Sequence, residues 1–436
     1  MKTQDNIVFL EQWFSLCRTD ESEKSFTRFV ADDAFLEYLS VLRIDCMEEE
    51  RKIEPLGMEP ITVEYDWGSE TYLIADIGSV DSVVRGGWLD GNSISDIMET
   101  YLERIVGDEV YYFYGRQFPV MVKILRISGR TPLQVCPDDL IASERYDTLG
   151  KRKLWVVEEA GQGSAISIGL SKEMTASEFY VACNNASIAP MLNTSVPKKG
   201  DVFMIEPGTV HCACGPLKIV EITESSPLDF NLVKWDSAGK AETDLDLAEA
   251  LDFITLSADG HICRCHDKGE DCHCHEEGAE CDCPKADIRL DDRGDEPVLK
   301  IADEQEFIVS RILLKDPVSI STEETESFAV YTCLQGSASV QVPSEGDTGR
   351  MAIYPLQKDS AILVPADCTE FFLVPMSVDT ILLETLVRRV DVQDGYIDPD
   401  SEARLEGEDY SKDEDLEDRI DYILEQRRLN GMSPNN

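Results

Sequence analysis

The stretch GDVFMIEPGTVHCACGPLKIVEIT, residues 200–223, decides the fold class of this chain. Its apolar residues fall in short runs rich in valine and isoleucine, and Gly, Pro and acidic residues separate the runs. Runs of this length and composition are typical of strands joined by turns and are too short for ordinary helices. The stretch therefore predicts β-structure. It also holds His211, the one histidine outside the segment 261–275.

The same pattern recurs on both sides of this stretch. Strand-like runs begin near residue 60 with ITVEYDW, TYLIADI, PVMVKILRIS and KLWVVEE, and later runs include FIVSRILLK, FAVYTCLQG and TILLETLV. Strand, glycine-containing turn and strand repeat in the manner of a β-sandwich or jelly-roll barrel. Helical spacing occurs in residues 1–55, at SISDIMETYLERIV and at DLDLAEALDFI. We therefore predict a mainly β chain with flanking helices.

Changes in composition divide the 436 residues into five parts, and this length allows more than one hydrophobic core. The predicted parts are a helical N-terminal segment (1–58), a first β-domain (59–255), an insertion rich in cysteine and histidine (256–292), a second β-domain (293–392), and an acidic linker with a C-terminal helix (393–436).

The chain is strongly acidic, with 86 Asp and Glu against 40 Lys and Arg and a formal net charge of -46. Nucleic acids and anionic membranes bind basic surfaces, so we expect neither as a partner, and the sequence names no protein partner. Apolar runs fall short of the ~20 residues that cross a bilayer, and the N-terminus lacks a signal-peptide layout. We therefore expect a cytoplasmic protein with reduced thiols.

Three segments together resemble one enzyme family. They are FPVMVKILRISGRTPLQVCPDD at 118–139, GKRKLW at 150–155, and the stretch 200–236 with its PGTVH motif. Their order and spacing are similar to those of the type I phosphomannose isomerases, over roughly residues 60–390. The resemblance implies two cupin-like jelly-roll barrels and a zinc ion held by Gln, His, Glu and a second His. It also implies interconversion of mannose 6-phosphate and fructose 6-phosphate through an enediol, for which a divalent cation withdraws charge from the sugar oxygens.

Four positions correspond to the metal ligands of that family, and two of them keep the family's residue. Gln134 and His211 match the glutamine and the second histidine, whereas Cys136 replaces the first histidine and Lys153 replaces the glutamate. A thiolate can bind zinc. A lysine ammonium repels the ion, but it can stand where the metal charge stood and hold an anionic ligand. The resemblance thus implies a residual metal site of Gln134, Cys136 and His211.

The catalytic positions implied by the resemblance are also altered. Lys151 matches a lysine beside the site, whereas Asn231 stands where the family's arginine is expected. These two are the candidate catalytic residues. A small anionic sugar is the expected ligand, and its candidate contacts are Gln134, Lys151, Lys153 and His211.

Each of these residues also has a purely structural interpretation. Gln134 and His211 could be hydrogen-bonded residues inside a barrel, and Cys136 a small core residue. The three bases at 151–153 could form a solvated turn. However, the strand KLWVV carries an indole and a valine on the face of Lys153, which favours an inward-pointing side chain.

Residues 263–283, CRCHDKGEDCHCHEEGAECDC, belong to a nine-residue repeat. Its Cys-x-Cys pairs bring two sulfurs close enough to chelate one ion, and the adjoining histidines add nitrogen ligands. Such ligands could hold two tetrahedral zinc ions or a Cu(I) cluster, and we expect zinc here rather than at the residual site. The spacing is not that of a zinc finger, so the alternative is an acidic insertion that binds metal opportunistically. The candidate ligands are Cys263, Cys265, His266, Cys272, His273, Cys274, His275, Cys281 and Cys283.

The sequence leaves three functions open. The first is the isomerase reaction, weakened or lost because Lys153 and Asn231 replace functional residues of the family. The second is a non-catalytic pseudoenzyme that binds a sugar phosphate and acts in regulation. The third is metal buffering by the repeat, with the β-domains as a scaffold.

Overall fold

The structure is a computed structural model, and it describes residues 51–235, 241–243, 246–258, 288–291, 294–322, 325, 327–344 and 350–387. The chain divides into a unit of residues 1–52 and a unit of residues 53–436, and every element named below belongs to the second unit. The predicted N-terminal helices, the cysteine and histidine ligands at 263–283 and the C-terminal helix lie outside the described residues.

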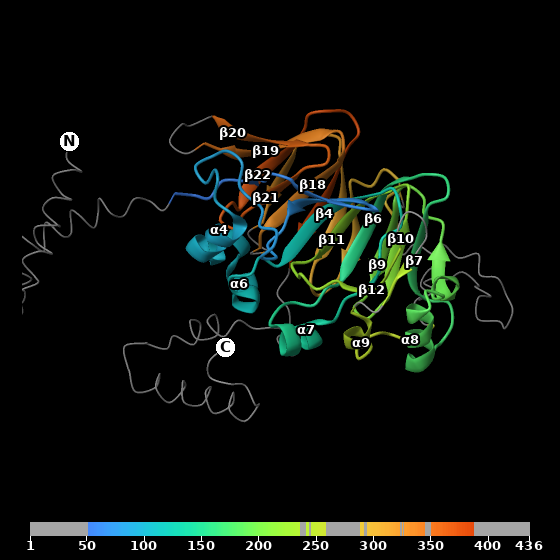
Figure 1. Cartoon of the computed structure of the whole chain (residues 1–436). Helices are drawn as coiled ribbons and strands as arrows, with labels where there is room; N and C mark the ends of the chain where they lie inside the picture. Colours follow the sequence, from blue (N-terminus) through green and yellow to red (C-terminus); the bar gives the residue numbers. More distant parts are fainter. Residues whose placement is uncertain are drawn as a thin grey trace, which may run out of the picture. The chain divides into compact units, whose positions relative to one another are not determined.

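Four antiparallel sheets build the described part of the second unit (Figure 1). Sheet 1 contains, in order, β13 (Ala241–Glu242), β12 (Phe230–Trp235), β5 (Leu133–Val135), β10 (His211–Cys214), β7 (Ala165–Leu170) and β8 (Leu192–Ser195). Sheet 2 contains β14 (Ile288–Arg289), β9 (Asp201–Ile205), β6 (Lys153–Ala160), β11 (Leu217–Glu224), β4 (Val120–Ile127), β3 (Gly68–Ile74) and β2 (Ile61–Tyr65). Sheet 3 contains β1 (Leu56–Gly57), β21 (Ala361–Val364), β18 (Ala329–Gln335), β23 (Thr380–Leu386), β16 (Ile308–Leu314) and β15 (Val298–Asp303). Sheet 4 contains β17 (Val318–Ser321), β22 (Glu370–Pro375), β19 (Ser337–Pro343) and β20 (Met351–Gln357).

Hydrophobic cores between the sheets fix the order of the layers. Trp155 of β6 and Ala213 of β10 share the core between sheets 2 and 1. Val122 of β4 and Val330 of β18 share the core between sheets 2 and 3. Leu373 of β22 belongs to the core between sheets 4 and 3. The sheets therefore stack in the order 1, 2, 3, 4. Sheets 1 and 2 form the first sandwich, sheets 3 and 4 form the second, and the two sandwiches pack against each other through sheets 2 and 3.

Alternation along β4 shows how one strand serves two layers. Val122 and Ile124 face sheet 3, whereas Leu125 faces sheet 1 and Lys123 lines a cavity on that same side. A strand covered on both faces has a nearly continuous apolar sequence, which explains the run PVMVKILRIS. Lys123 interrupts this run yet is only 3% exposed, so it marks a polar region inside the first sandwich.

Short helices flank the sheets, and their starts follow ordinary capping chemistry. The helix predicted at 93–106 forms, but Leu102, with φ of 50°, divides it into two. The first half begins at Ser93, whose hydroxyl and backbone exchange hydrogen bonds with Asp96. The helices are α4 (Ile94–Tyr101), α5 (Glu103–Val106), α6 (Asp108–Tyr114), α7 (Asp139–Tyr146), α8 (Ala176–Asn184) and α9 (Leu247–Ala250), with a 3-10 turn η1 (Ala189–Met191).

The prediction of a mainly β chain with two β-units and flanking helices is confirmed. Two strands differ from the predicted boundaries. β1 pairs with β21 of the second sandwich, although its residues were expected in a helical segment. β14 pairs with β9 of the first sandwich, although its residues were expected in the cysteine-rich insertion. Two-residue strands contain too few residues to show a period, so their partners decide their conformation.

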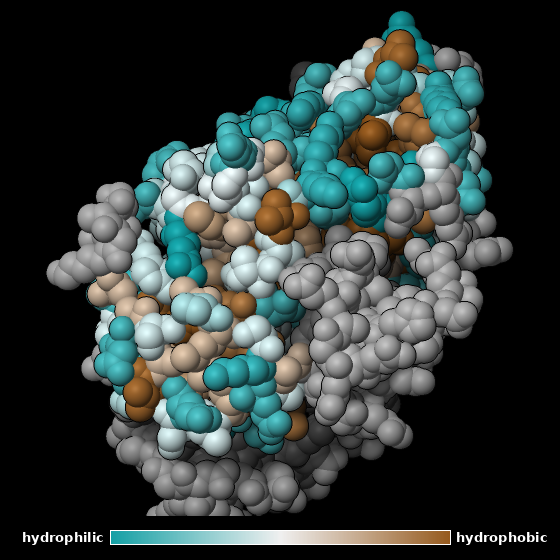
Figure 2. Space-filling model, turned by 90° about the vertical axis from the view of Figure 1, so that its right-hand side faces the viewer, coloured by the Kyte–Doolittle hydropathy of each residue, from teal (hydrophilic) through white to brown (hydrophobic). Residues whose placement is uncertain are grey.

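None of the described helices is long and apolar enough to span a bilayer. On the face shown in Figure 2, hydrophilic residues are spread over the surface and border the hydrophobic ones. Strongly exposed hydrophobic side chains such as Val196 and Val378 come from separate sandwiches. Scattered apolar residues of this kind are ordinary for a protein surface.

A cluster of carboxyl groups lies where the two sandwiches meet. Arg152 donates from Nε to Glu306 at 2.9 Å and from its backbone N–H to Glu224 at 2.9 Å. Burial, followed by the neighbouring charges of Asp139 and Glu306, raises the pKa of Glu224 well above its usual value. The folded protein therefore holds a proton on Glu224 that the unfolded chain releases at lower pH.

We expect Glu224→Gln to make the stability less dependent on pH. A carboxyl whose pKa rises on folding stabilises the protein below its unfolded pKa of ~4.3, and this contribution declines as the pH rises. The wild type should lose up to ~1.4 kcal/mol per pH unit relative to the variant as the pH rises above about 5 toward the raised pKa of Glu224 in the folded protein. Urea unfolding across this range measures the difference. Glu370→Gln, at an exposed strand position, is the control, and parallel pH profiles for wild type and Glu224→Gln would refute the expectation.

Candidate active site

Neighbouring strands of sheet 1 bring three of the predicted residues into one row. Gln134 of β5 pairs in register with His211 of β10 on one side and with Asn231 of β12 on the other. Gln134 Nε2 donates to Asn231 Oδ1 at 3.2 Å. Lys153 begins β6 in the facing sheet 2 and is 2% exposed, which confirms the prediction that its side chain points inward.

A second row of polar residues crosses sheet 2. Glu221 of β11 lies between Trp155 of β6 and Lys123 of β4 in the strand register. Its carboxylate accepts from Trp155 Nε1 at 2.5 Å and lies 3.1 Å from Lys123 Nζ, which is also 3.3 Å from Glu70. Burial opposes ionisation of Glu221, but Lys123 and then Lys153 outweigh it and lower the pKa of Glu221 to about 2.

Asp229, in the segment before β12, joins two buried lysines. Lys151 Nζ lies 2.5 Å from its Oδ2 and Lys153 Nζ lies 2.6 Å from its Oδ1. The two lysine side chains are 1% and 2% exposed, and that of Asp229 is 23% exposed. Burial opposes the charge of Asp229, but Lys151 and Lys153 hold its pKa well below the usual value. Burial likewise opposes the charge of Lys153, and Asp229 outweighs it and raises the pKa of Lys153.

His211 and Cys136 contact this ion cluster as neutral groups. His211 Nε2 lies 3.1 Å from Lys153 Nζ, and its Nδ1 lies 2.9 Å from the Thr209 carbonyl oxygen. Burial and then the charge of Lys153 lower the pKa of His211 to about 3, so Nδ1 donates to the carbonyl and Nε2 accepts from the ammonium. Cys136 Sγ donates to Asp229 Oδ1 at 3.3 Å, and burial raises the pKa of this thiol to about 12.

The residues of the predicted residual metal site do not fit a divalent cation as they are arranged here. The Lys153 ammonium lies against His211 Nε2, Cys136 is a thiol, and the Gln134 amide is bonded to Asn231. Within the described residues, no group of three or more His, Cys, Asp or Glu side chains is arranged to hold a metal ion. The candidate metal ligands at 263–283 lie outside those residues.

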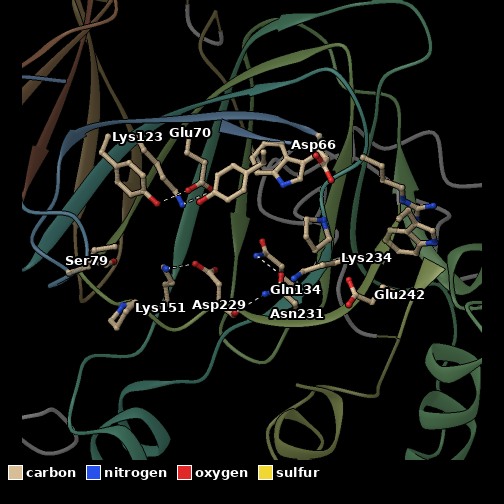
Figure 3. Close-up of a pocket in the computed structure, with 18 of the residues that line it drawn as sticks. Asp66, Glu70, Ser79, Lys123, Gln134, Lys151, Asp229, Asn231, Lys234 and Glu242 are labelled. Carbon is tan, nitrogen blue, oxygen red and sulfur yellow. Dashed lines mark hydrogen bonds and ion pairs between the residues drawn. The ribbon is translucent and has the colours of Figure 1, made fainter. Parts of the chain in front are cut away.

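A cavity of about 820 Å³ opens beside the ion cluster inside the first sandwich (Figure 3). Of the predicted residues, Gln134, Lys151 and Asn231 line it, whereas Cys136, Lys153 and His211 do not. The structure thus brings all six together but lets only the first three reach a ligand. Figure 3 shows Lys151 directed toward Asp229 and Gln134 directed toward Asn231.

The sequence interpretation missed the acidic partners of this site. Asp229, Glu221 and Glu70 compensate the lysine charges, yet none was a candidate. One signal was available for Glu221, because the strand LKIVEIT places a single carboxylate among apolar residues. Asp229 lies in the irregular segment SSPLD, where no period indicates the direction of a side chain.

Comparison with known proteins gives consistent results at the levels of sequence and fold. No model of a known protein family matches the chain. The chain is 27% identical to the mannose-6-phosphate isomerase of Streptococcus mutans over 200 residues, which are 44% of this chain and 61% of that protein. Two Bacillus subtilis proteins that carry the same enzyme name provisionally, YvyI and GmuF, are 23% and 24% identical over 229 and 234 residues, each match covering 71% of the relative and 48% and 49% of this chain.

Solved structures of mannose-6-phosphate isomerases share the fold of this chain. The mannose 6-phosphate isomerase of Bacillus subtilis superposes with a TM-score of 0.58 at 18% identity, covering 76% of this chain and 99% of that chain. A variant of the phosphomannose isomerase of Salmonella typhimurium gives a TM-score of 0.57 at 12% identity, covering 78% and 100%. Identities this low support a common fold and nothing finer.

The chain therefore has the fold of these isomerases, with two β-sandwiches of which the first has a polar interior that opens into a cavity. The predicted pair of cupin-like units is thereby confirmed. Within that fold, the chain is similar in sequence to proteins named mannose-6-phosphate isomerase, at 23–27% identity.

Proposed function

We propose that this chain binds a sugar phosphate in the cavity of the first sandwich, and that its isomerase reaction is weak or lost. One observation carries the proposal. The Lys153 ammonium, at the position of a metal ligand in the family resemblance, contacts His211 Nε2 at 3.1 Å and Asp229 Oδ1 at 2.6 Å. The positive charge of a lysine therefore stands where the family resemblance places the charge of a zinc ion.

This substitution preserves charge but not the chemistry of a metal. A metal ion polarises the sugar oxygens that bind it directly. Lys153 does not line the cavity, and its charge is already compensated by Asp229. Asn231, at the position of the family's arginine, is uncharged and its side-chain oxygen accepts from Gln134. An enediolate would thus find little new positive charge to stabilise it.

The cavity keeps the polar groups that recognise a sugar. The Gln134 and Asn231 amides, the Lys151 ammonium and the Asp229 carboxylate all line it. Amides and charged groups of this kind donate to and accept from hydroxyl groups. Trp67 and Trp235 also line the cavity and offer apolar surface to the faces of a sugar ring. Polar and aromatic groups in one lining are suited to binding a sugar.

We expect the purified full chain to bind mannose 6-phosphate and fructose 6-phosphate in isothermal titration calorimetry. Removal of metal with a chelator should leave the dissociation constants unchanged, because side chains and not a metal ion supply the positive charge that lines the cavity. A coupled isomerase assay with added zinc should give a turnover number below ~1 s⁻¹, the low end for ordinary enzymes. Turnover above that value, or binding that requires zinc, would contradict the proposal.

We further propose that the repeat at 263–283 binds zinc independently of the cavity, as its Cys-x-Cys-His pattern indicates. Metal analysis of the full chain and of a chain lacking residues 259–287 tests this proposal. Equal zinc content in the two proteins would overturn it.

A further inference from the structure

The cations that line the cavity differ in how their charge is compensated. At the end of the cavity where Lys151 lies, Lys123 is 3.1 Å from Glu221 and Lys151 is 2.5 Å from Asp229. Paired charges this close largely cancel each other at longer range. This end of the cavity therefore attracts a further anion only weakly.

Two other cations, Arg130 and Lys234, also line the cavity. Figure 3 shows Lys234 at the opposite end from Lys151, near Glu242 and Asp66. Within the described part of the chain, neither Arg130 nor Lys234 forms an ion pair with these carboxylates or with any other. Both cations are half-buried, whereas Asp66 and Glu242 are exposed. Solvent screens the exposed carboxylates more strongly than the half-buried cations, so the cations dominate the field felt inside the cavity.

Arg130 is held in a geometry that suits an anion. Its Cζ lies 3.6 Å from the centroid of the Trp235 ring, and one terminal nitrogen lies 3.8 Å from Cys212 Sγ. Stacking uses the flat face of a guanidinium and leaves N–H groups at its edge. Edge donors of this kind bind two oxygens of a phosphate at once. Lys234 is adjacent to Trp235 in β12 and adds a point charge.

We infer that Arg130 and Lys234 form an anion subsite that takes the phosphate group of the ligand, while the sugar hydroxyls contact Gln134, Asn231 and Lys151. This inference rests on the proposed function. It also accounts for how an anion could approach a chain of net charge -46, because two unpaired cations create a local attraction within an acidic surface.

Calorimetric titration of Arg130→Gln and Lys234→Gln with three probes tests the subsite. The probes are mannose 6-phosphate, mannose and inorganic phosphate. Each variant should raise the dissociation constant for mannose 6-phosphate and for phosphate about tenfold, as expected for losing a hydrogen bond to a charged group. Binding of mannose should not change. The matched controls are Arg145→Gln and Lys315→Gln, which remove exposed cations of surface ion pairs.

Arg130 packs on Trp235, so its variant also needs a test of folding. Urea unfolding provides it, and Lys234→Gln is the structurally milder change because, in the described part of the chain, Lys234 does not stack on an aromatic ring as Arg130 does. Unchanged affinity for mannose 6-phosphate in both variants would overturn the subsite and leave the proposed function standing. Phosphate binding that depends on Arg130 and Lys234, without binding of mannose 6-phosphate, would support the subsite and contradict the proposed function. If the wild type bound neither mannose 6-phosphate nor inorganic phosphate, both proposals would fail.

Discussion

Asp229→Asn should destabilise the folded protein by ~3–5 kcal/mol, the usual cost of removing one partner from a buried ion pair. Asp229 is the shared counter-ion of Lys151 and Lys153, whose side chains are 1% and 2% exposed. The change preserves side-chain size and removes only the charge, so packing differences contribute little. Urea unfolding at pH 7 measures the loss of free energy.

The pH dependence adds a second signature. Folding lowers the pKa of Asp229, so its contribution is fully present above its unfolded value of ~3.9 and is lost as the pH falls toward the folded value. The difference between wild type and variant should therefore be constant from about pH 5 to pH 8 and should shrink in stronger acid.

Asp252→Asn is the matched control for Asp229→Asn. Asp252 forms an ion pair with Arg145 at 3.1 Å, but both side chains are exposed. Exposed pairs contribute ~1 kcal/mol or less, so this change should be close to neutral. Similar losses for the two aspartates would mean that the buried lysines do not depend on Asp229.

Lys153→Glu should convert the ion cluster into a metal site. Removing the ammonium frees His211 Nε2 and Asp229 Oδ1, which lie 3.1 and 2.6 Å from its nitrogen. The Cys136 thiol, which donates a hydrogen bond to Asp229 Oδ1, lies beside them. With one more carboxylate, the cluster holds nitrogen, oxygen and sulfur donors of the kind that zinc and cobalt(II) bind. We expect about one additional equivalent of cobalt(II) relative to the wild type.

Two measurements detect metal binding by the Lys153→Glu variant. Cobalt(II) bound by nitrogen and sulfur gives visible absorption, and the difference spectrum against the wild type cancels any contribution from the repeat at 263–283. Metal should also raise the melting temperature of the variant more than that of the wild type, because it binds the folded state. Adding His211→Ala to the variant should abolish both effects. The same cobalt uptake and thermal response in Lys153→Glu and wild type would refute the prediction.

The parts of this site that follow from the sequence are those that lie on regular strands. Alternation in KLWVV fixes the direction of Lys153, because a strand side chain can point only to one face or the other. Gln134 and Lys151 were candidates because short motifs match the family, and both line the cavity, although Lys151 lies before β6 rather than on a strand. Asp229 could not be predicted, because it lies between β11 and β12 where the backbone has no regular period.

The layer order could not be predicted either. The sequence shows that the run around Lys123 is apolar on both faces, but not which sheet covers each face. That choice depends on contacts between residues far apart in the chain, such as Val122 with the core that includes Val330. Likewise, the pairing of β1 with β21 joins residues about 300 positions apart and leaves no local signal.

The position of sheet 2 in the middle of the layers has a consequence for how the protein is built. One face of β4, β6 and β11 carries the polar cluster beside the cavity, and the second sandwich packs against the other face. A change of side-chain volume in the core between sheets 2 and 3 therefore acts on strands that carry Lys123, Lys153 and Glu221. The second sandwich thus packs directly behind the candidate site, and changes in its core reach the strands that hold the polar cluster.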